Sequence, residues 1–322
     1  MKDYNGKVAF ITGGASGVGL GQAQLFGQAG AKICIADIRQ DHLDSALETL
    51  RSMGIEAHGV KLDVTDREGY AAAADECERV FGTPPQLLFL TAGVNTFGPA
   101  ECSTYDDYDW VIGVNLGGVV NGLVTFVPRM IKAGLGGHIA MTASWGGFEG
   151  GAITAPYAAA KAAVINLGDS YYQALKPYGI GVTVLTPENV KSNIFESNMT
   201  RPEGMGATGY NVDEKTIDFL RNFHARGMEP IELAKWLKDG MEAGQVVVVP
   251  YADGEEKLKE VYSKWINYAS PEGMARLEEL EKKVESEKDA DRSVVQDDAF
   301  VKSGWGKANP NIDWVDSSKK KQ

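Results

Sequence analysis

The sequence predicts an α/β fold, a doubly wound parallel sheet in a single domain, from three observations. Short apolar and β-branched runs recur along the chain, longer segments of helical period separate them, and a glycine-rich turn follows the first run directly. Parallel strands need long crossover connections, so this alternation favours a parallel sheet with helices on both faces. Seven runs are expected to be strands: residues 7–12, 31–37, 56–63, 86–93, 137–144, 181–187 and 245–250.

Two stretches depart from the alternation. Residues 191–228 contain several glycines and no clean period, which predicts a lid, and the chain beyond 250 shows no strand signal. We therefore expect one domain over residues 1–250 and a C-terminal helical extension and tail over 251–322. Within the extension, residues 271–290 are expected to form a charged surface helix and residues 303–314 an irregular tail.

The composition narrows the class of protein. The chain has 322 residues, of which 43% are hydrophobic and 24% charged, as is typical of a globular enzyme-sized domain. Its net charge of −12, with no opposing basic stripe, argues against a nucleic-acid partner. The N-terminus shows no export signal, and no apolar run approaches the ~20 residues that cross a bilayer. A cytoplasmic protein without a membrane partner is expected.

Metal and disulfide chemistry is not indicated. Cys34, Cys77 and Cys102 show no CxxC spacing, and the four histidines show neither HxxxH spacing nor a nearby carboxylate cluster. We therefore expect no metal and three buried thiols. His224 lies in the predicted lid, where a solvated side chain is favoured over contact with a substrate.

The turn after the first predicted strand carries the strongest local signal. Residues 12–19 read TGGASGVG and lead directly into a helical segment, without the Lys-Ser/Thr ending of an ATP-binding loop. Glycines let the backbone approach a phosphate, and the start of a helix offers unpaired amide donors to an anion. A tight turn that binds nothing is the alternative. The residues expected to bind a diphosphate are Gly13, Ser16, Gly17, Val18 and Gly19.

Asp37 ends the second predicted strand. An acidic residue that bonds the adenosine ribose is expected ~20 positions beyond the glycine turn, and Asp37 lies close to that position. Its charge would repel a 2′-phosphate, so the cofactor is expected to be NAD rather than NADP. Arg39 weakens this expectation, because an arginine at a strand end can attract the 2′-phosphate. A turn or helix-capping carboxylate is the other interpretation of Asp37.

Two YxxxK pairs compete for the catalytic role, and spacing alone cannot choose between them. Residues four apart share one face of a helix, so either lysine can lie beside its tyrosine. Tyr157 and Lys161 follow a strand end, a glycine-rich loop and Pro156, which suits the first turn of a helix beside a ligand pocket. Tyr172 and Lys176 precede a proline at a helix end and are expected to have no catalytic role.

The predicted chemistry needs a phenol that can exchange a proton. A tyrosine with an ordinary pKa near ~10 is a poor base at neutral pH, so Lys161 and a positive nicotinamide ring are expected to favour the phenolate of Tyr157. Ser144, at the end of a predicted strand, can place its hydroxyl beside the same substrate oxygen and stabilise its charge. A turn serine is the alternative.

Together these motifs resemble the short-chain dehydrogenases/reductases over roughly residues 5–250. The resemblance implies a Rossmann-like dinucleotide-binding and catalytic domain, with Asn115 as a fourth catalytic residue that holds a water linking Lys161 to solvent. It also implies that Lys161 bonds the nicotinamide ribose. Further cofactor contacts are implied for Asp63 and Val64 beside the adenine, for Ala92 and Gly93 after the fourth strand, and for Val190 and Ser192 beside the carboxamide. Two positions depart from the family pattern, Thr91 in place of its Asn and Glu188 in place of its Gly.

A narrower resemblance is to the bacterial Cα-dehydrogenases that oxidise lignin-derived aryl ethers, carried by LTAGVNTFGPAE and TYDDYDWVIGVNLGGVVNGLVTFVPRMI. It implies a benzylic secondary alcohol as the small-molecule substrate. Aromatic residues near the predicted loops and lid favour an aryl substrate, and ordinary lid packing is the alternative. They are Phe97, Trp145, Phe148, Phe195, Phe219 and Phe223.

Assembly and competing functions complete the expectations. The resemblance implies that the helices around residues 104–131 and 157–168 form a homodimer interface, often doubled into a homotetramer. The C-terminal extension is expected to cover the lid or to reach a neighbouring subunit. Besides an alcohol dehydrogenase, the same sequence is compatible with action on aliphatic alcohols, with epimerisation or dehydration through a transient ketone, and with a dinucleotide sensor that lacks chemistry.

Overall fold

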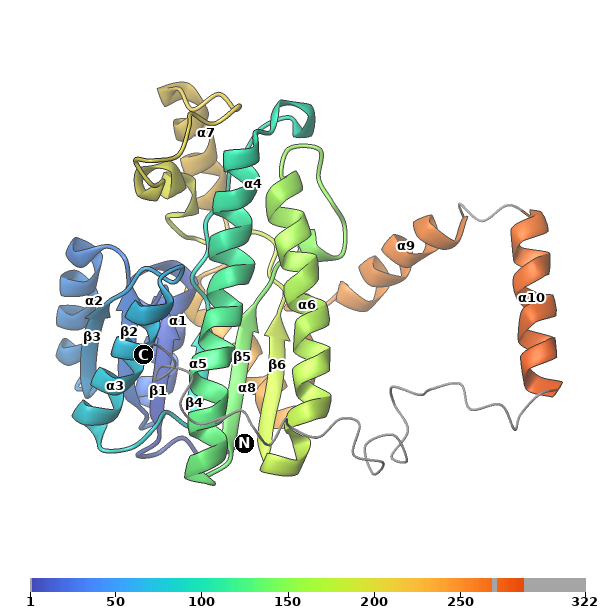
Figure 1. Ribbon diagram of the computed structural model, residues 1–322. Helices are drawn as coiled ribbons and strands as arrows, with labels where there is room; N and C mark the ends of the chain where they lie inside the picture. Colours follow the sequence, from blue (N-terminus) through green and yellow to red (C-terminus); the bar gives the residue numbers. More distant parts are fainter. Residues whose placement is uncertain (1, 268–270, 287–322) are drawn as a thin grey trace, which may run out of the picture. The chain divides into compact units, whose positions relative to one another are not determined.

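The computed structural model describes residues 2–267 and 271–286, and a parallel sheet of seven strands lies at its centre (Figure 1). The strand order is β3-β2-β1-β4-β5-β6-β7, and neighbouring strands are parallel. This confirms the predicted doubly wound fold. The strands are β1 (Val8–Thr12), β2 (Lys32–Asp37), β3 (Ala57–Lys61), β4 (Leu87–Leu90), β5 (Gly137–Thr142), β6 (Ile180–Leu185) and β7 (Val247–Val248).

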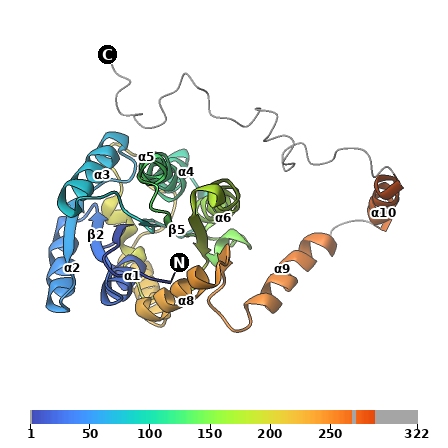
Figure 2. The ribbon, with the colours of Figure 1, turned by 90° about the horizontal axis from the view of Figure 1, so that it is seen from below.

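Helices cover both faces of the sheet. Figure 2 shows α3, α5 and α6 on one side and α1, α2 and α8 on the other, and a separate apolar core fills each side. The helices of this layer structure and the lid are α1 (Gly17–Gln28), α2 (Gln40–Ser52), α3 (Arg67–Phe81), α4 (Tyr105–Ile112), α5 (Gly118–Ala133), α6 (Ala155–Leu175), α7 (Glu214–His224) and α8 (Pro230–Ala243). Short turns of 3-10 helix are η1 (Ala100–Cys102), η3 (Trp145–Gly147), η4 (Lys176–Tyr178) and η5 (Ile194–Thr200), and η2 (Gly113–Gly117) is π-helical.

Burial on both faces explains the sequences of the central strands. β1 reads VAFIT and β4 reads LLFL, and every residue of both is buried. Helices leave these strands no solvent face, so continuous apolar runs replace an alternation of apolar and polar residues. The edge strands differ: β7 is shorter than the run expected over 245–250, and β3 is only partly buried.

The sheet order places the functional site. Successive strands run outward from β1 in one direction to β3, and then from β4 in the other direction to β7. The loops that leave β1 and β4 therefore diverge at the carboxyl ends of adjacent strands. Such a topological switch point leaves a crevice, where open α/β sheets bind their ligands.

One helical segment corrects an expectation from the sequence. Residues Tyr105–Ala133, which comprise α4, η2 and α5, are long and apolar enough to cross a bilayer, and an 18-residue window within them has a mean hydropathy of 1.7. The inner face of α5 packs in the core through Leu123, Phe126 and Met130. A core helix of an α/β protein passes the same test of length and composition, so this segment is weak evidence for a membrane span.

The structure divides into two units, Met1–Ala252 and Asp253–Gln322. In the first, the lid (residues 191–228) contains η5 and α7, so part of a stretch expected to be irregular is helical. In the second are α9 (Gly254–Asn267) and α10 (Pro271–Ser286). The expected charged helix over 271–290 is described as far as residue 286, and the tail expected over 303–314 lies outside the described residues.

Candidate active site

A cavity of about 360 Å³ lies at the carboxyl ends of the strands, bordered by the glycine turn, by the loops after β2, β4, β5 and β6, and by the lid. It gathers all but one of the catalytic and cofactor-binding residues predicted from the sequence, and Asn115 is the exception. Those that line it are Gly13, Ser16, Gly17, Val18, Gly19, Asp37, Asp63, Val64, Ala92, Gly93, Ser144, Tyr157, Lys161, Val190 and Ser192.

The glycine turn has the shape of a diphosphate cradle. Gly13 has φ +63°, and a Cβ there would lie 2.8 Å from the Cα of Ala92. A Cβ on Gly19 would lie 2.1 Å from the carbonyl oxygen of Gly13, so only glycine lets α1 begin this close to β1. Ser16 caps α1 without a side-chain hydrogen bond, which leaves the first amides of the helix open. The turn therefore fits the diphosphate of a dinucleotide.

Carboxylates border the end of the cavity next to β2. Asp37 accepts hydrogen bonds from the backbone amides of Ala15 (3.3 Å) and Arg39 (3.1 Å), which hold its carboxylate beside the glycine turn. The guanidinium of Arg39 binds Asp41 at 2.7 Å and Glu196 of the lid at 3.0 Å. The cation that could attract a 2′-phosphate is thus already paired with two carboxylates.

Tyr157, Ser144 and Lys161 meet at the opposite end of the cavity. Tyr157 lies in the first turn of α6, next to Pro156, and Ser144 caps η3 after β5. The Ser144 hydroxyl donates to the carbonyl of Pro187 at 3.2 Å and accepts from the Gly146 amide at 3.2 Å. Lys161 is 3% exposed, and its Nζ donates to the carbonyl of Thr142 at 2.8 Å and lies 5.4 Å from the Tyr157 ring centroid.

Burial dominates the electrostatics of this group. It raises the pKa of Tyr157, against the smaller lowering effect of the Ser144 hydrogen bond. It also lowers the pKa of Lys161 to about 8. In the protein alone Tyr157 is therefore a neutral phenol, and the phenolate expected beside Lys161 requires additional positive charge at the site.

Asn115 positions the loop after β4. It is fully buried in η2, where its Oδ1 accepts from the Val94 amide at 3.0 Å and its Nδ2 donates to the Val94 carbonyl at 2.8 Å. Both ends of the side chain are therefore used to hold Val94, which lines the cavity. π-Helical turns often mark functional sites. The water-holding role implied by resemblance stays a prediction.

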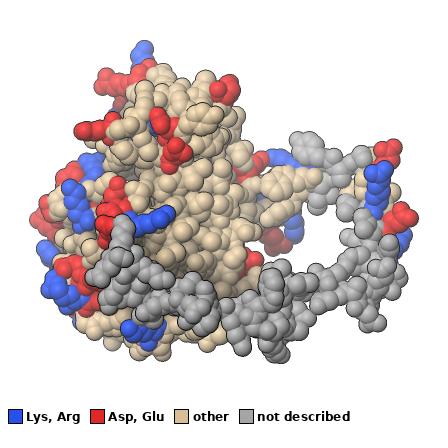
Figure 3. Space-filling view, viewed as in Figure 1, with Lys and Arg blue, Asp and Glu red and all other residues tan. Residues whose placement is uncertain are grey.

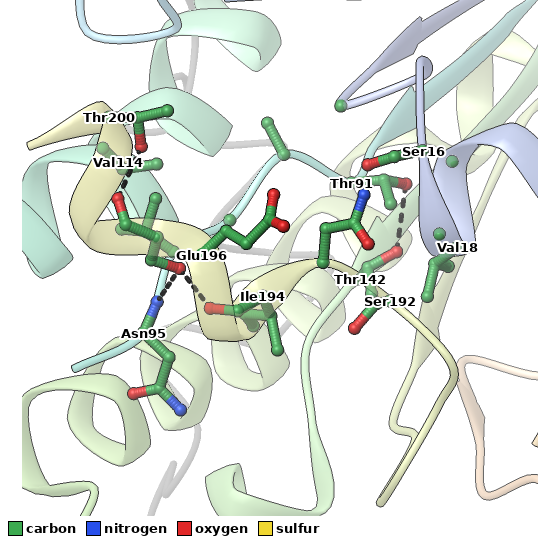
Figure 4. Close-up of a pocket in the computed structure, with 18 of the residues that line it drawn as sticks. Ser16, Val18, Thr91, Asn95, Val114, Thr142, Ser192, Ile194, Glu196 and Thr200 are labelled. Atoms are coloured by element: carbon green, nitrogen blue, oxygen red, sulfur yellow. Dashed lines mark hydrogen bonds between the residues drawn. The ribbon is translucent and has the colours of Figure 1, made fainter. Parts of the chain in front are cut away.

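The two departures from the family pattern have local explanations. The hydroxyl of Thr91 donates to Gln22 Oε1 at 2.8 Å and lies 3.1 Å from the Thr142 hydroxyl, so it ties the loop after β4 to α1 and β5 (Figure 4). The amide of Glu188 donates to the Tyr251 hydroxyl at 2.6 Å. Since no described residue other than glycine has a positive φ, position 188 does not require glycine here.

The aromatic lining differs from the expectation. Phe97 and Phe223 line the cavity, and so does Trp110 of α4, which the sequence did not single out. The other four expected aromatics lie elsewhere: Trp145 and Phe148 pack against each other, Phe195 is buried within the lid, and Phe219 is 68% exposed.

Two other sequence expectations are wrong. His224 is buried rather than solvated, lines the cavity, and bonds Asn189 through Nδ1 at 2.9 Å. Burial lowers its pKa, against the opposing effect of the Val190 carbonyl, so the imidazole is neutral at pH 7. Cys102 is exposed, whereas Cys34 and Cys77 are buried. Across the described part of the chain, no three His, Cys, Asp or Glu residues cluster as metal ligands.

The second YxxxK pair lies away from the cavity. Tyr172 is near the end of α6, and Lys176 begins η4. The Nζ of Lys176 lies 4.5 Å from the Tyr172 ring centroid, so the local pairing resembles that of Tyr157 and Lys161. Neither residue lines the cavity, which agrees with the choice made from sequence context.

Comparison with known proteins gives consistent results. A model of the short chain dehydrogenase family matches residues 7–203. A protein named C alpha-dehydrogenase from Sphingobium sp. strain SYK-6 is 54% identical to the chain over 271 residues, which are 84% of this chain and 89% of that protein.

Solved structures share the fold. The apo form of LigD from the same strain has a TM-score of 0.70 and 48% sequence identity, covering 84% of this chain and all of that one. A short chain dehydrogenase/reductase from Burkholderia phymatum, solved in complex with NAD, has a TM-score of 0.75 and 30% identity, covering 80% of this chain and 94% of that one.

Proposed function

The chain belongs to the short-chain dehydrogenase family and is an alcohol dehydrogenase of the type that uses NAD or NADP. On this premise, we propose that it oxidises the benzylic secondary alcohol of a lignin-derived aryl ether to a ketone, with NAD as hydride acceptor. The observation that carries the proposal is that Tyr157 lines the same cavity as the diphosphate cradle and as the aromatic side chains of Phe97, Trp110 and Phe223.

Tyr157 acts as the acid/base. A bound NAD would accept the hydride that the carbinol carbon loses, and Tyr157 as a phenolate would take the hydroxyl proton. Ser144 orients the carbinol oxygen beside that phenol, since its hydroxyl lowers the pKa of Tyr157 and lines the same cavity. The reaction produces a ketone, a reduced nicotinamide and one proton.

Lys161 supplies positive charge to the phenol. Its ammonium lies 5.4 Å from the ring and is held by the Thr142 carbonyl. Because burial works against a phenolate, the positive ring of the oxidised nicotinamide is the second charge that the chemistry needs. By family resemblance, Lys161 also binds the nicotinamide ribose.

NAD is favoured over NADP at the other end of the site. The Asp37 carboxylate is held beside the glycine turn, where it would lie near the adenosine ribose of a bound dinucleotide and its charge would repel a 2′-phosphate. Asp63 and Val64 line the neighbouring wall, as expected for contacts with an adenine ring.

An aryl substrate is supported by two facts. Phe97, Trp110 and Phe223 give the cavity aromatic surface near the lid, where a ring can pack edge-on or offset. The relative that is 54% identical is named for dehydrogenation at a Cα position. Together they favour a carbinol that carries an aromatic ring.

A substrate series tests this function. Aryl carbinols with a β-aryl ether, the same carbinols without the ether, and aliphatic secondary alcohols would be offered with NAD while nicotinamide reduction is followed by absorbance. We expect kcat/KM to be at least ~100-fold higher for the aryl ethers, equivalent to about 3 kcal/mol of transition-state binding. Better turnover of the aliphatic alcohols would reject the aryl assignment.

A further inference from the structure

An ion pair joins the lid to the cofactor end of the cavity. Glu196 belongs to η5, and its carboxylate binds Nη1 of Arg39 at 3.0 Å, across 157 positions of sequence. Both residues line the cavity, and both side chains are partly buried, at 30% and 24% exposed. Figure 4 shows Glu196 on the segment that crosses the cavity, together with Ser192 and Ile194.

The partners of Arg39 leave it little capacity for another anion. Its Nη2 and Nε bind the two oxygens of Asp41, at 2.7 Å and 3.3 Å, in a forked arrangement. Its Nη1 binds Glu196. The guanidinium therefore binds a carboxylate at its Nε/Nη2 edge and another at Nη1. Arginine uses the same donors to bind a phosphate.

The segment that carries Glu196 is held in place independently of Arg39. Ser197, the next residue, accepts a hydrogen bond from the Asn95 amide at 3.0 Å, and its hydroxyl donates to the Ile194 carbonyl at 2.6 Å. Ser192 lies against Gly17, because a Cβ built on Gly17 would be 2.9 Å from the Ser192 Cβ. The lid therefore presents its carboxylate from a fixed backbone.

We propose that Glu196 is a specificity-determining residue of the cofactor site, which occupies Arg39 and so prevents it from binding the 2′-phosphate of NADP. The proposal rests on the proposed use of NAD and extends it. Asp37 repels the phosphate from the strand end, and Glu196 occupies the arginine of the described cavity lining that could compensate. Cofactor choice is then set partly by the lid, which also covers the substrate.

Binding of two adenosine fragments tests the proposal without catalysis. The dissociation constants of 2′,5′-ADP and 5′-AMP, which differ by the 2′-phosphate, would be measured by calorimetry on the full chain, together with those of NADP and NAD. For Glu196→Gln, we expect the affinity for 2′,5′-ADP relative to 5′-AMP to rise roughly tenfold, because one charge-assisted contact becomes available. The same change is expected in the ratio of NADP to NAD affinity.

Three further variants make the result specific. Glu203→Gln removes the same charge from an exposed position of the lid that does not line the cavity, and it should leave the fragment ratio at the wild-type value. Arg39→Ala breaks the same ion pair without releasing a cation, so it should show no gain for 2′,5′-ADP. The double variant Arg39→Ala/Glu196→Gln should lose the gain seen in Glu196→Gln.

The outcomes separate the two claims. A wild-type protein that binds NADP more tightly than NAD would reject the proposed cofactor, whatever the variants do. A wild-type preference for NAD with an unchanged ratio in Glu196→Gln would reject the role of Glu196 alone. An equal gain in Glu203→Gln would also reject it, since the effect would then be one of overall charge.

Discussion

The buried Lys161, beside the proposed acid/base Tyr157, destabilises the fold. Lys161 is 3% exposed, and burial lowers its pKa from 10.5 to about 8. At neutral pH the folded protein therefore holds a cation that would be more stable in water, with one hydrogen bond to Thr142 as compensation. Burial of Lys161 therefore lowers the stability of the folded protein, as is common where a charged group is needed for function.

Replacement of this lysine is expected to stabilise the protein while it removes activity. For Lys161→Met we predict a free energy of unfolding about 2 kcal/mol higher at pH 7. The lowered pKa of Lys161 corresponds to a destabilisation of about 3 kcal/mol, and the loss of its hydrogen bond to Thr142 offsets about 1 kcal/mol of the gain. The folded pKa lies below the unfolded one, so the penalty is complete below pH 8 and is relieved as the pH rises toward 10.5. Urea unfolding at pH 7 and pH 10 checks this.

The expected outcome is a stability gain that shrinks at the higher pH. A destabilised Lys161→Met protein would show that the lysine is satisfied in the fold, against the burial argument. The control is Lys132→Met, which removes a lysine from the exposed C-terminal end of α5 and should leave the free energy of unfolding nearly unchanged.

At the scale of elements, the lid is attached to α4 by a buried ion pair. Arg201, 10% exposed, binds the fully buried Asp107 at 2.8 Å, and its guanidinium lies 5.3 Å from the ring of Trp110, which lines the cavity. Burial raises the pKa of Asp107, but hydrogen bonds from Thr104, Thr208 and Gly209 outweigh it and hold the pKa below the ordinary value. The same contact thus fixes both the lid and one aromatic wall.

Breaking this pair should affect stability and substrate binding together. We predict that Arg201→Met lowers the free energy of unfolding by about 3 kcal/mol, since a buried carboxylate loses its cation, and raises the KM for an aryl carbinol several-fold. Because the pKa of Asp107 is depressed in the folded state, the stability that it contributes is present above pH ~4 and is lost as the pH falls through the folded value.

Denaturant melts at pH 7 and pH 3, with KM measured at pH 7, test this prediction. Arg201→Lys keeps the charge and should retain most of both properties. An Arg201→Met variant with the wild-type KM would mean that the ion pair does not position Trp110 in the wall of the cavity.

The parts of the site that were predictable from sequence are those encoded locally. The glycine turn, Asp37 at a strand end, and Tyr157 with Lys161 one helical turn later each depend on spacing along a single element. Glu196 could not be found this way, because its partner Arg39 is 157 positions away and only the fold brings them together. Residues 191–228 were likewise expected to be irregular, although α7 forms there by packing Leu220 and His224 inward.

At the scale of the whole molecule, one area of the surface carries few charged side chains. Figure 3 shows an uncharged area in the centre of the view, where Figure 1 places α4 and α6 and the upper part of α5, although the net charge of the chain is −12. On α5, Val120 and Val124 are 39% and 51% exposed. Apolar side chains on an uncharged face favour association of copies of the chain.

We predict that the chain forms a homodimer or homotetramer through α5 and α6. Val124→Glu would place a carboxylate at that interface and should give a smaller species in sedimentation velocity at micromolar concentration. Val212→Glu makes the same change at an exposed valine of the lid and should leave the mass unchanged. A wild-type protein that sediments as a monomer at high concentration would refute this assembly.

We propose that Tyr157, and not Tyr172 of the equally spaced second pair, exchanges the proton with the hydroxyl of the carbinol. The most direct test is the kcat/KM of Tyr157→Phe and Tyr172→Phe with NAD and an aryl carbinol, alongside the dissociation constant of NAD. We predict a loss of about 10²–10⁴-fold for Tyr157→Phe with NAD binding retained, and a change within about twofold for Tyr172→Phe. Substantial turnover by Tyr157→Phe, or a comparable loss in Tyr172→Phe, would contradict the account.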